Sequence, residues 1–461
     1  MGKVKNGLIF LFYRIRILVT YHPSFELMRY QEINPQLFIA NRKQLAKLLK
    51  PASLALFNSN DTMPTNADGH MAFRQNNDLF YLSGVDQAHS ILVLCPAFPD
   101  KKYREVLFVQ ETNEQIATWE GHKLTKEEAR KLTGVETVMW TSEFNKLFHY
   151  MMTMGGVENV YLNTNEHYRA EIKVETRDAR FITWCQKHYP LHRYERIAPI
   201  SSKLRSIKSK IEIDLMQKAC DITETAFRKV LQFVKPGVKE YEIEAAYAHE
   251  FLRKGSRGFA YTPIIASGAN SCVLHYIEND KVCQRGAILL LDVGAEYANY
   301  NADLTRSIPV NGKYTKRQKD VYNAVLRVQK AAIKMLRPGV LYFEYHKEVQ
   351  QLIERELVDL KLISKTAIKN QHPDRPAFQK YFMHGTSHML GLDVHDVGNM
   401  HAKIQAGQVW TVEPGIYIKE EELGIRIENN VVIGKDKNFD LMKNIPIETE
   451  EIEELMSKAI R

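Results

Sequence analysis

The spacing of hydrophobic residues changes about two-fifths of the way along the chain. Before this point, short apolar runs with the length of strands, such as SLALFN, SILVLC, EVLFV and NVYLN, alternate with helical stretches such as Phe38 to Leu49. This alternation predicts an α/β domain. After Pro199 the apolar residues recur at helical spacing. We therefore expect an N-terminal α/β domain at 28–198 and a second domain at 199–461, preceded by an extension at 1–27.

The second domain contains a repeated pattern. A long helix, a turn and a second helix are expected around KPGV at 235–238, and the same order recurs around RPGV at 337–340. Strands with a pair of acidic residues follow each copy. The shared order predicts an internal duplication, in which two half-sites face each other across a pseudo-twofold axis.

Each copy places two carboxylates on one expected β-hairpin. If residues 296–299 form a four-residue loop, Asp292 lies opposite Asp303. A loop at 419–422 likewise places Glu413 opposite Glu428. Directly opposed residues have Cβ atoms about 4.5–5.5 Å apart.

Opposed like charges within apolar strands require compensation. They repel each other and lose hydration, so either one carboxylate of each pair holds a proton or cations lie among them. Four negative charges balance two divalent ions, as in two-metal hydrolytic sites. A solvent-exposed hairpin suits Glu420, Glu421 and Glu422, but it suits Asp292 poorly because five apolar residues precede it. We favour the metal hypothesis.

Three histidines lie between the two hairpins, in FMHGTSHMLGLDVHDVGN. Imidazole beside carboxylates suits manganese, cobalt, zinc or iron. The spacing of His384 and His388 is that of a zinc-binding helix, but no Glu follows His384, and Gly385 weakens the helix prediction. A helix-borne zinc site is the weaker interpretation.

Composition and charge exclude several classes of protein. The net charge is +8, but basic residues are interleaved with acidic ones, which gives no nucleic-acid fingerprint. Five cysteines without CxxC spacing favour a reduced compartment, and we expect a cytoplasmic protein. Residues 1–27 are basic, and their apolar run is too short and too charged for stable membrane insertion. They are interpreted as an extension upstream of a start at Met28, with a secretory signal or a mitochondrial presequence as alternatives.

The ordered motifs LLLDVGAEYANYNADLTRS, HGTSHMLGLDVHDVG, VEPGIY and GIRIEN resemble those of metallopeptidases with the pita-bread fold, most closely the Xaa-Pro aminopeptidases, also called aminopeptidase P. Upstream, NADGHMAFRQNNDLFYLSG resembles the N-terminal domain of that subfamily. The resemblance implies an α/β (α+β) protein, with a creatinase-like N-terminal α/β domain followed by a pita-bread catalytic domain. It extends from about residue 40 to the C-terminus.

The resemblance also implies a dinuclear metal site, with manganese as the usual metal and cobalt, zinc or iron as alternatives. Asp303 and Glu428 would bridge the two ions, and a hydroxide between the ions would be the nucleophile. The implied metal ligands are Asp292, Asp303, His388, Glu413 and Glu428.

Further residues would surround the metals and the substrate. Glu413 would pass a proton, His395 would contact the substrate near the scissile bond, and Arg426 would orient Glu428. The candidates for catalysis are Glu413, His395, His275 and His384, and those for substrate binding are His275, His384, His395, Tyr417 and Arg426.

The implied activity is release of the N-terminal residue from peptides with proline in the second position, by a homodimer or homotetramer. A prolidase, which cleaves only dipeptides, is the nearest alternative. A non-catalytic binding module and a metal-free creatinase-like enzyme on the same fold are less compatible with an intact ligand set.

Overall fold

The structure is a computed structural model that describes residues 29–458. The expected extension at 1–27 lies outside the described residues. Within the described part of the chain, no helix is long and apolar enough to cross a membrane.

The N-terminal half forms one mixed sheet of six strands in the order β4-β3-β2-β1-β5-β6. The first three strands along the chain pair antiparallel, and the remaining pairs are parallel. Four of these strands lie in the apolar runs that the sequence indicated. The strands are β1 (Ser53–Asn58), β2 (Ile91–Leu94), β3 (Glu105–Val109), β4 (Thr137–Trp140), β5 (Asn159–Leu162) and β6 (Arg193–Arg196).

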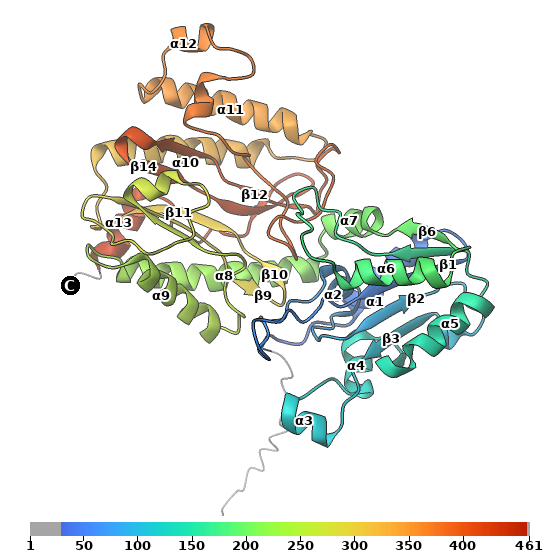
Figure 1. Cartoon of the computed structure of the whole chain (residues 1–461). Helices are drawn as coiled ribbons and strands as arrows, with labels where there is room; N and C mark the ends of the chain where they lie inside the picture. Colours follow the sequence, from blue (N-terminus) through green and yellow to red (C-terminus); the bar gives the residue numbers. More distant parts are fainter. Residues whose placement is uncertain (1–28, 459–461) are drawn as a thin grey trace, which may run out of the picture.

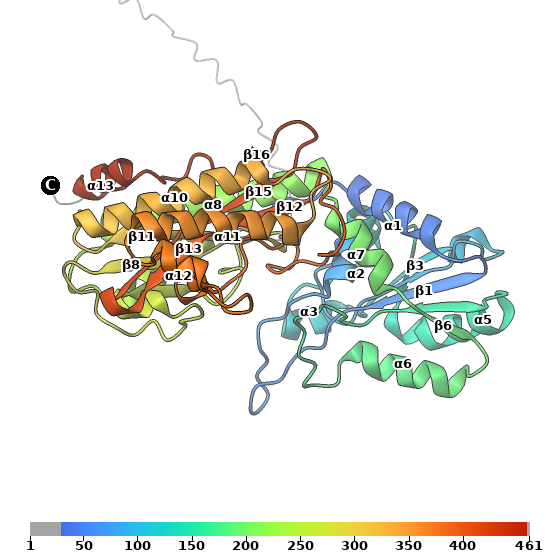
Figure 2. The same ribbon diagram turned by 90° about the horizontal axis from the view of Figure 1, so that it is seen from above.

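Helices cover both faces of this sheet, because alternate residues of a strand point to opposite sides. Leu54 and Leu56 of β1 pack in one core, whereas Ala55 and Phe57 pack in another. In Figure 2, α1 lies on one side of the sheet and α5 and α6 lie on the other. The helices of this half are α1 (Gln36–Leu48), α2 (Asn77–Ser83), α3 (Glu114–Glu120), α4 (Lys126–Thr133), α5 (Phe144–Met154) and α6 (Arg177–His188).

The second half places helices on both sides of a central group of strands (Figure 1). The helices α8 and α9 lie on one side, and α10 and α11 lie on the other. Helix α7 (Ala198–Ser206) connects this half to the N-terminal sheet. The other helices are α8 (Lys210–Phe233), α9 (Glu240–Arg253), α10 (Lys316–Met335), α11 (Tyr342–Asp359), α12 (Lys365–Lys369) and α13 (Thr449–Ser457).

Short antiparallel strands fill the space between the two helix pairs. They are β7 (Ile264–Ser267), β8 (Ile288–Val293), β9 (Glu296–Tyr297), β10 (Tyr300–Asn301), β11 (Leu304–Pro309), β12 (Val409–Val412), β13 (Gly415–Ile418), β14 (Leu423–Arg426), β15 (Asn429–Val432) and β16 (Phe439–Asp440). The mixed α/β fold predicted from the sequence is confirmed.

Equivalent contacts at the two PGV turns support the predicted duplication. Gly237 and Gly339 have φ of 93° and 91°, a conformation that favours glycine. The N–H of Gly237 donates to the carbonyl of Cys283 at 3.0 Å, and the N–H of Gly339 donates to the carbonyl of Ile404 at 2.9 Å. Each turn is therefore fixed to the segment that leads into the first acidic strand of its copy.

The register of the first acidic hairpin differs from the prediction. Asp292 pairs with Thr305 rather than with Asp303. The expected four-residue loop is wrong, because Tyr297 pairs with Tyr300 and only Ala298 and Asn299 form the turn. Both turn residues have positive φ, 53° and 66°, as a type I′ turn requires. The register shift is two residues, so both aspartates remain on one face of the hairpin.

The second hairpin has the predicted register. Ile418 pairs with Leu423, and residues 419–422 form the loop. Beyond Pro414, Val412 pairs with Asn429 in the same register. Glu413 and Glu428 therefore occupy opposed positions between these two paired segments.

Candidate functional site

The four carboxylates and His388 converge between the two copies. Asp303, His388 and Glu428 are buried, and each offers a ligand atom within 4.8 Å of the others. Glu428 reaches this position because its N–H donates to the carbonyl of Thr305 at 3.1 Å, which joins the strand after Asp303 to the second copy. The arrangement gathers oxygen and nitrogen donors from three separate segments.

His388 presents one ring nitrogen to the carboxylates. Its Nδ1 lies 3.0 Å from the carbonyl of Met389, which places the ring proton there. Its Nε2 lies 3.4 Å from Asp303 Oδ2 and 3.5 Å from Glu413 Oε1. Residues 383–395 form no helix, so the alternative of a helix-borne zinc pair is wrong.

Tyr261 lies between two acids that belong to one hairpin. Its hydroxyl oxygen is 2.6 Å from Asp292 Oδ1 and 2.6 Å from Asp303 Oδ1. One hydroxyl proton can serve only one of these oxygens at a time. The crowding of three oxygens indicates a place where positive charge is favourable.

Burial makes ionisation of the other acids costly. It raises the pKa of Glu428 well above its usual range, it raises the pKa of Asp303, and it raises the pKa of Glu413 to about 7. Glu428 Oε2 accepts from the Thr305 hydroxyl at 2.7 Å, whereas the buried Oε1 has no hydrogen-bond partner among the described residues. A buried carboxylate oxygen that has no hydrogen-bond partner and lies beside other carboxylates is suited to bind a metal ion.

Arg426 contacts a different acid from the one expected. Its Nη2 forms an ion pair with Asp292 Oδ2, and its Nη1 donates to the Tyr417 hydroxyl at 2.8 Å. Its link to Glu428 is indirect, because its Nε donates to the Thr305 hydroxyl at 3.2 Å and Thr305 in turn donates to Glu428. Arg426 thus orients Asp292 directly.

His384 continues this hydrogen-bonded chain as a neutral ring. Its Nε2 lies 2.8 Å from the Tyr417 hydroxyl, and its Nδ1 lies 2.9 Å from the carbonyl of Gly385. Burial, reinforced by Arg426, lowers the pKa of His384 to about 3. Tyr417 therefore donates to Nε2, and the ring proton lies on Nδ1.

His395 and His275 are exposed near the cluster. The ring of His395 lies 4.4 Å from that of His388, centroid to centroid, and desolvation lowers the pKa of His395 to about 3. His275 makes no hydrogen bond with the cluster among residues 29–458, but its charge contributes to lowering the pKa of both His384 and His395. Of the sequence-predicted histidines, His395 therefore lies beside His388, and His384 Nδ1 lies 3.8 Å from Glu413 Oε2.

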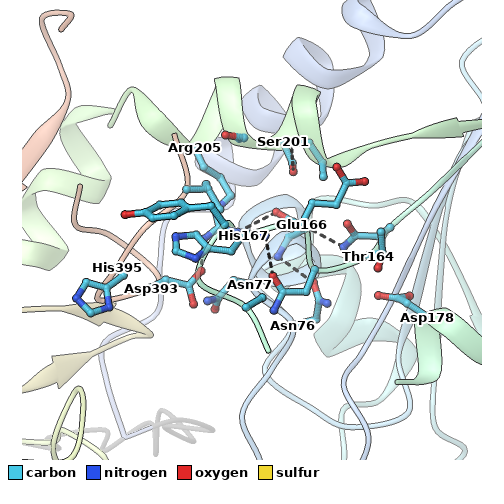
Figure 3. Close-up of a pocket in the computed structure, with 18 of the residues that line it drawn as sticks. Asn76, Asn77, Thr164, Glu166, His167, Asp178, Ser201, Arg205, Asp393 and His395 are labelled. Carbon is cyan, nitrogen blue, oxygen red and sulfur yellow. Dashed lines mark hydrogen bonds and ion pairs between the residues drawn. The ribbon is translucent and has the colours of Figure 1, made fainter. Parts of the chain in front are cut away.

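Two cavities flank the cluster. The larger, of about 670 Å³, lies between the two halves of the protein, and Figure 3 shows His395 at one end, with Arg205 and Asp393 along its wall. The second, of about 570 Å³, is bordered by His384. Each cavity thus reaches a histidine beside the candidate metal ligands, His395 in the first and His384 in the second.

Sequence reasoning missed Tyr261, Thr305 and Thr411. Thr411 fixes His388 by accepting from its N–H at 3.1 Å, and its own hydroxyl lies 3.3 Å from Glu413 Oε1. Thr305 and Thr411 each lie two residues from a candidate ligand, on the same face of the chain, which is the signal that could have identified them. Tyr261 has no such signal, since it is remote in sequence from both aspartates.

Comparison with known proteins identifies the family of the chain. Metallopeptidase family M24 matches residues 214–435, and the aminopeptidase P N-terminal domain matches residues 38–161. The Xaa-Pro aminopeptidase of Escherichia coli is 32% identical over 458 residues, covering 93% of this chain and 99% of that protein. The chain belongs to metallopeptidase family M24.

Solved structures agree with this membership. The zinc-substituted E. coli aminopeptidase P in complex with product has a TM-score of 0.82 at 32% identity and covers 93% of this chain and 99% of its own. Aminopeptidase PepP of Pseudomonas aeruginosa has a TM-score of 0.84 at 28% identity, with the same coverage. The chain is accordingly an enzyme of the hydrolase class that uses divalent metal, and the predicted family resemblance is confirmed.

Proposed function

We propose that this enzyme is a metalloaminopeptidase that releases the N-terminal residue from peptides with proline in the second position. The convergence of Asp303, His388 and Glu428 within 4.8 Å carries the proposal. The similarity to Xaa-Pro aminopeptidases along nearly the whole chain supports the substrate class. A prolyl amide has no N–H and a restricted backbone, which a shaped pocket can recognise.

We propose that two divalent cations, with manganese as the favoured metal, are held by Asp292, Asp303, His388, Glu413 and Glu428. The two-residue register shift of the first hairpin keeps its aspartates on one face, and the orphaned Glu428 Oε1 is available to a cation. Bound there, such ions would acidify a water molecule and place positive charge against the scissile carbonyl.

Glu413 is assigned the proton transfer. Its side chain is 18% exposed, against 12% for Asp292 and 7% for Asp303, so it is the most accessible of these acids to a water or a substrate. His395 and His275 are exposed beside the cluster and are assigned substrate contacts. These groups would position the peptide with its first carbonyl at the metal ligands.

Arg426 and Tyr417 are assigned a supporting role in substrate binding. Arg426 holds Asp292, and Tyr417 holds the neutral His384 through its hydroxyl. A neutral His384 can accept or donate hydrogen bonds without adding a cation beside the metals. Arg426 therefore fixes a proposed metal ligand, and Tyr417 fixes a histidine that lines the second cavity.

A peptide panel tests the proposal. Purified enzyme with manganese should release arginine from Arg-Pro-Pro, and Glu413→Gln should lower this rate at least about 100-fold, because the amide can neither transfer the proton nor serve as an anionic metal ligand. Glu420→Gln is the matched control, since Glu420 lies in the loop of the same hairpin, 58% exposed, and should retain full activity. Cleavage of Gly-Pro alone would instead establish a prolidase.

We also propose a cytoplasmic enzyme that assembles as a homodimer or homotetramer. All five cysteines are free and buried, as expected in a reducing compartment. Light scattering at working concentration tests the assembly, and a monomeric mass would contradict it.

A further inference from the structure

The segment that carries His395 is fastened to both halves of the protein. Asn301, on β10 of the hairpin that carries Asp292 and Asp303, donates from Nδ2 to the carbonyls of Gly391 at 3.0 Å and Leu392 at 2.9 Å. Asn77, at the start of α2 in the N-terminal domain, donates to the same Leu392 carbonyl at 3.2 Å. Residues 391–396 therefore bridge the catalytic strands and the N-terminal domain.

A buried arginine makes a second, charged connection at this place. Arg205 of α7 is 4% exposed and contacts three carboxylates. Its Nη1 lies 3.0 Å from Asp78 Oδ1 on α2, and its Nη2 lies 2.7 Å from both Asp393 Oδ2 and Asp396 Oδ1. A planar guanidinium can serve several carboxylates in fixed directions, which a lysine cannot do.

Asp396 is held from a second side as well. The Lys208 ammonium lies 2.8 Å from Asp396 Oδ2, and both side chains are 1% exposed. A Cβ built on Gly391 would lie 2.2 Å from the same Oδ2, so the backbone packs directly against this carboxylate. The residues on both sides of His395 in the chain thus have little freedom to move.

We propose that Arg205, Lys208, Asp78, Asp393 and Asp396, here called the Arg205 clamp, position His395 for the reaction and make the N-terminal domain part of the catalytic apparatus. The inference rests on the proposed function, because His395 is assigned a substrate contact there. Arg205 is a positioning residue that acts through His395. Breaking the clamp leaves the metal ligands in place but lets residues 391–396 move away from the substrate.

A double-mutant cycle tests this role. Asp393→Ala removes a contact from a side chain that is 47% exposed, so the variant should fold. Asp78→Ala removes the charged link to the N-terminal domain and leaves the hydrogen bond of Asn77 in place. Each should lower kcat for Arg-Pro-Pro about tenfold, with little change in KM. In a His395→Ala background neither should lower kcat further, because their effects pass through the same residue. Equal losses in both backgrounds would overturn the proposal.

Glu105→Gln is the matched control. The Arg42–Glu105 pair also involves an almost fully buried arginine, 2.8 Å from its carboxylate, but it lies within the N-terminal domain and away from residues 391–396. It should leave kcat unchanged. A tenfold loss in this variant would mean that any weakening of the N-terminal domain slows the enzyme, and it would overturn a specific role for the clamp.

Hydrogen exchange provides a readout that does not depend on activity. In Asp78→Ala, amides of residues 389–398 should exchange at least about fivefold faster than in the wild type, while Glu105→Gln should leave them unchanged. Unchanged exchange in Asp78→Ala would overturn the clamp. If the wild type fails to cleave Arg-Pro-Pro, the proposed function fails, but the exchange result still decides whether the clamp holds the segment.

Discussion

The hydroxyl of Thr305 donates to Glu428 Oε2 at 2.7 Å and thereby connects the first acidic hairpin to the second. The same hydroxyl accepts from Arg426 Nε at 3.2 Å. Because Arg426 also pairs with Asp292, one buried threonine joins two candidate ligands on opposite halves of the duplication. Side chains that orient metal ligands in this way tune both metal affinity and activity.

Thr305→Val should weaken manganese binding by about 10–100-fold, because Glu428 loses its only side-chain donor among residues 29–458 while the side-chain volume is kept. Thr305→Ser retains the hydroxyl and should bind manganese nearly as well as the wild type. Competition with a chromogenic chelator measures both affinities. Equal affinities for the valine and serine variants would show that this hydrogen bond does not orient Glu428.

Tyr261→Phe should lower metal affinity about tenfold, since the hydroxyl that contacts both Asp292 and Asp303 is lost. Tyr247→Phe is the matched control. Tyr247 is fully buried, but its hydroxyl has no hydrogen-bond partner among the described residues, so its removal should leave metal binding unchanged. If both variants bind equally, Tyr261 is a packing residue only.

Metal removal should destabilise the fold. Binding to the folded state alone adds about 2.7 kcal/mol when free metal is about 100 times its Kd. For a chain of this length the addition corresponds to a rise in Tm of about 3 °C. Calorimetry with manganese and with a chelator measures the difference. Asp303→Ala should show no rise, and an equal rise in that variant would place the bound metal elsewhere.

The burial of Asp178, a residue outside the candidate metal site, predicts that the stability of the fold depends on pH. Burial raises its pKa to about 7, although Asn58 donates to its Oδ1 at 2.8 Å. Between about pH 4 and 7 the folded protein keeps a proton that the unfolded chain has lost, so wild-type stability falls as pH rises through this window. Asp178→Asn removes this dependence.

The free energy of unfolding of Asp178→Asn should exceed that of the wild type by about 2 kcal/mol at pH 8, after a discount for the partial exposure of Asp178. At about pH 4 the difference should be near zero. The asparagine is the more stable form at high pH, because its amide oxygen can still accept from Asn58. Urea unfolding at both pH values measures the gap. A variant that is less stable than the wild type at pH 8 would show that the folded protein stabilises the charged carboxylate, so that the pKa of Asp178 is not raised.

The two hairpins show what could and could not be predicted from the sequence. The loop at 419–422 is charged and lies between two apolar runs, so its limits were visible and the pairing of Ile418 with Leu423 followed. The first turn is formed by Ala298 and Asn299, both with positive φ. Alanine rarely adopts this conformation, and no glycine marks the turn, so the sequence suggested a longer loop.

Long-range side-chain contacts were beyond sequence reasoning. Asp292 and Asp303 remained on one face despite the wrong register, since the error was an even number of residues. In contrast, the placement of Arg426 on Asp292 depends on how β14 packs against β8 and β11, which no local pattern encodes. The ion pairs of Arg205 could not be predicted either, because its three acidic partners lie more than a hundred residues away, one before it in the chain and two after it.

The metal stoichiometry of the enzyme, measured together with its activity, tests the central claim most directly. Wild-type protein equilibrated with manganese should retain about two ions per chain and cleave Arg-Pro-Pro, whereas Asp303→Ala should lose both properties. Retention of both ions and of full activity by Asp303→Ala, or a wild type that binds no manganese, would contradict the account.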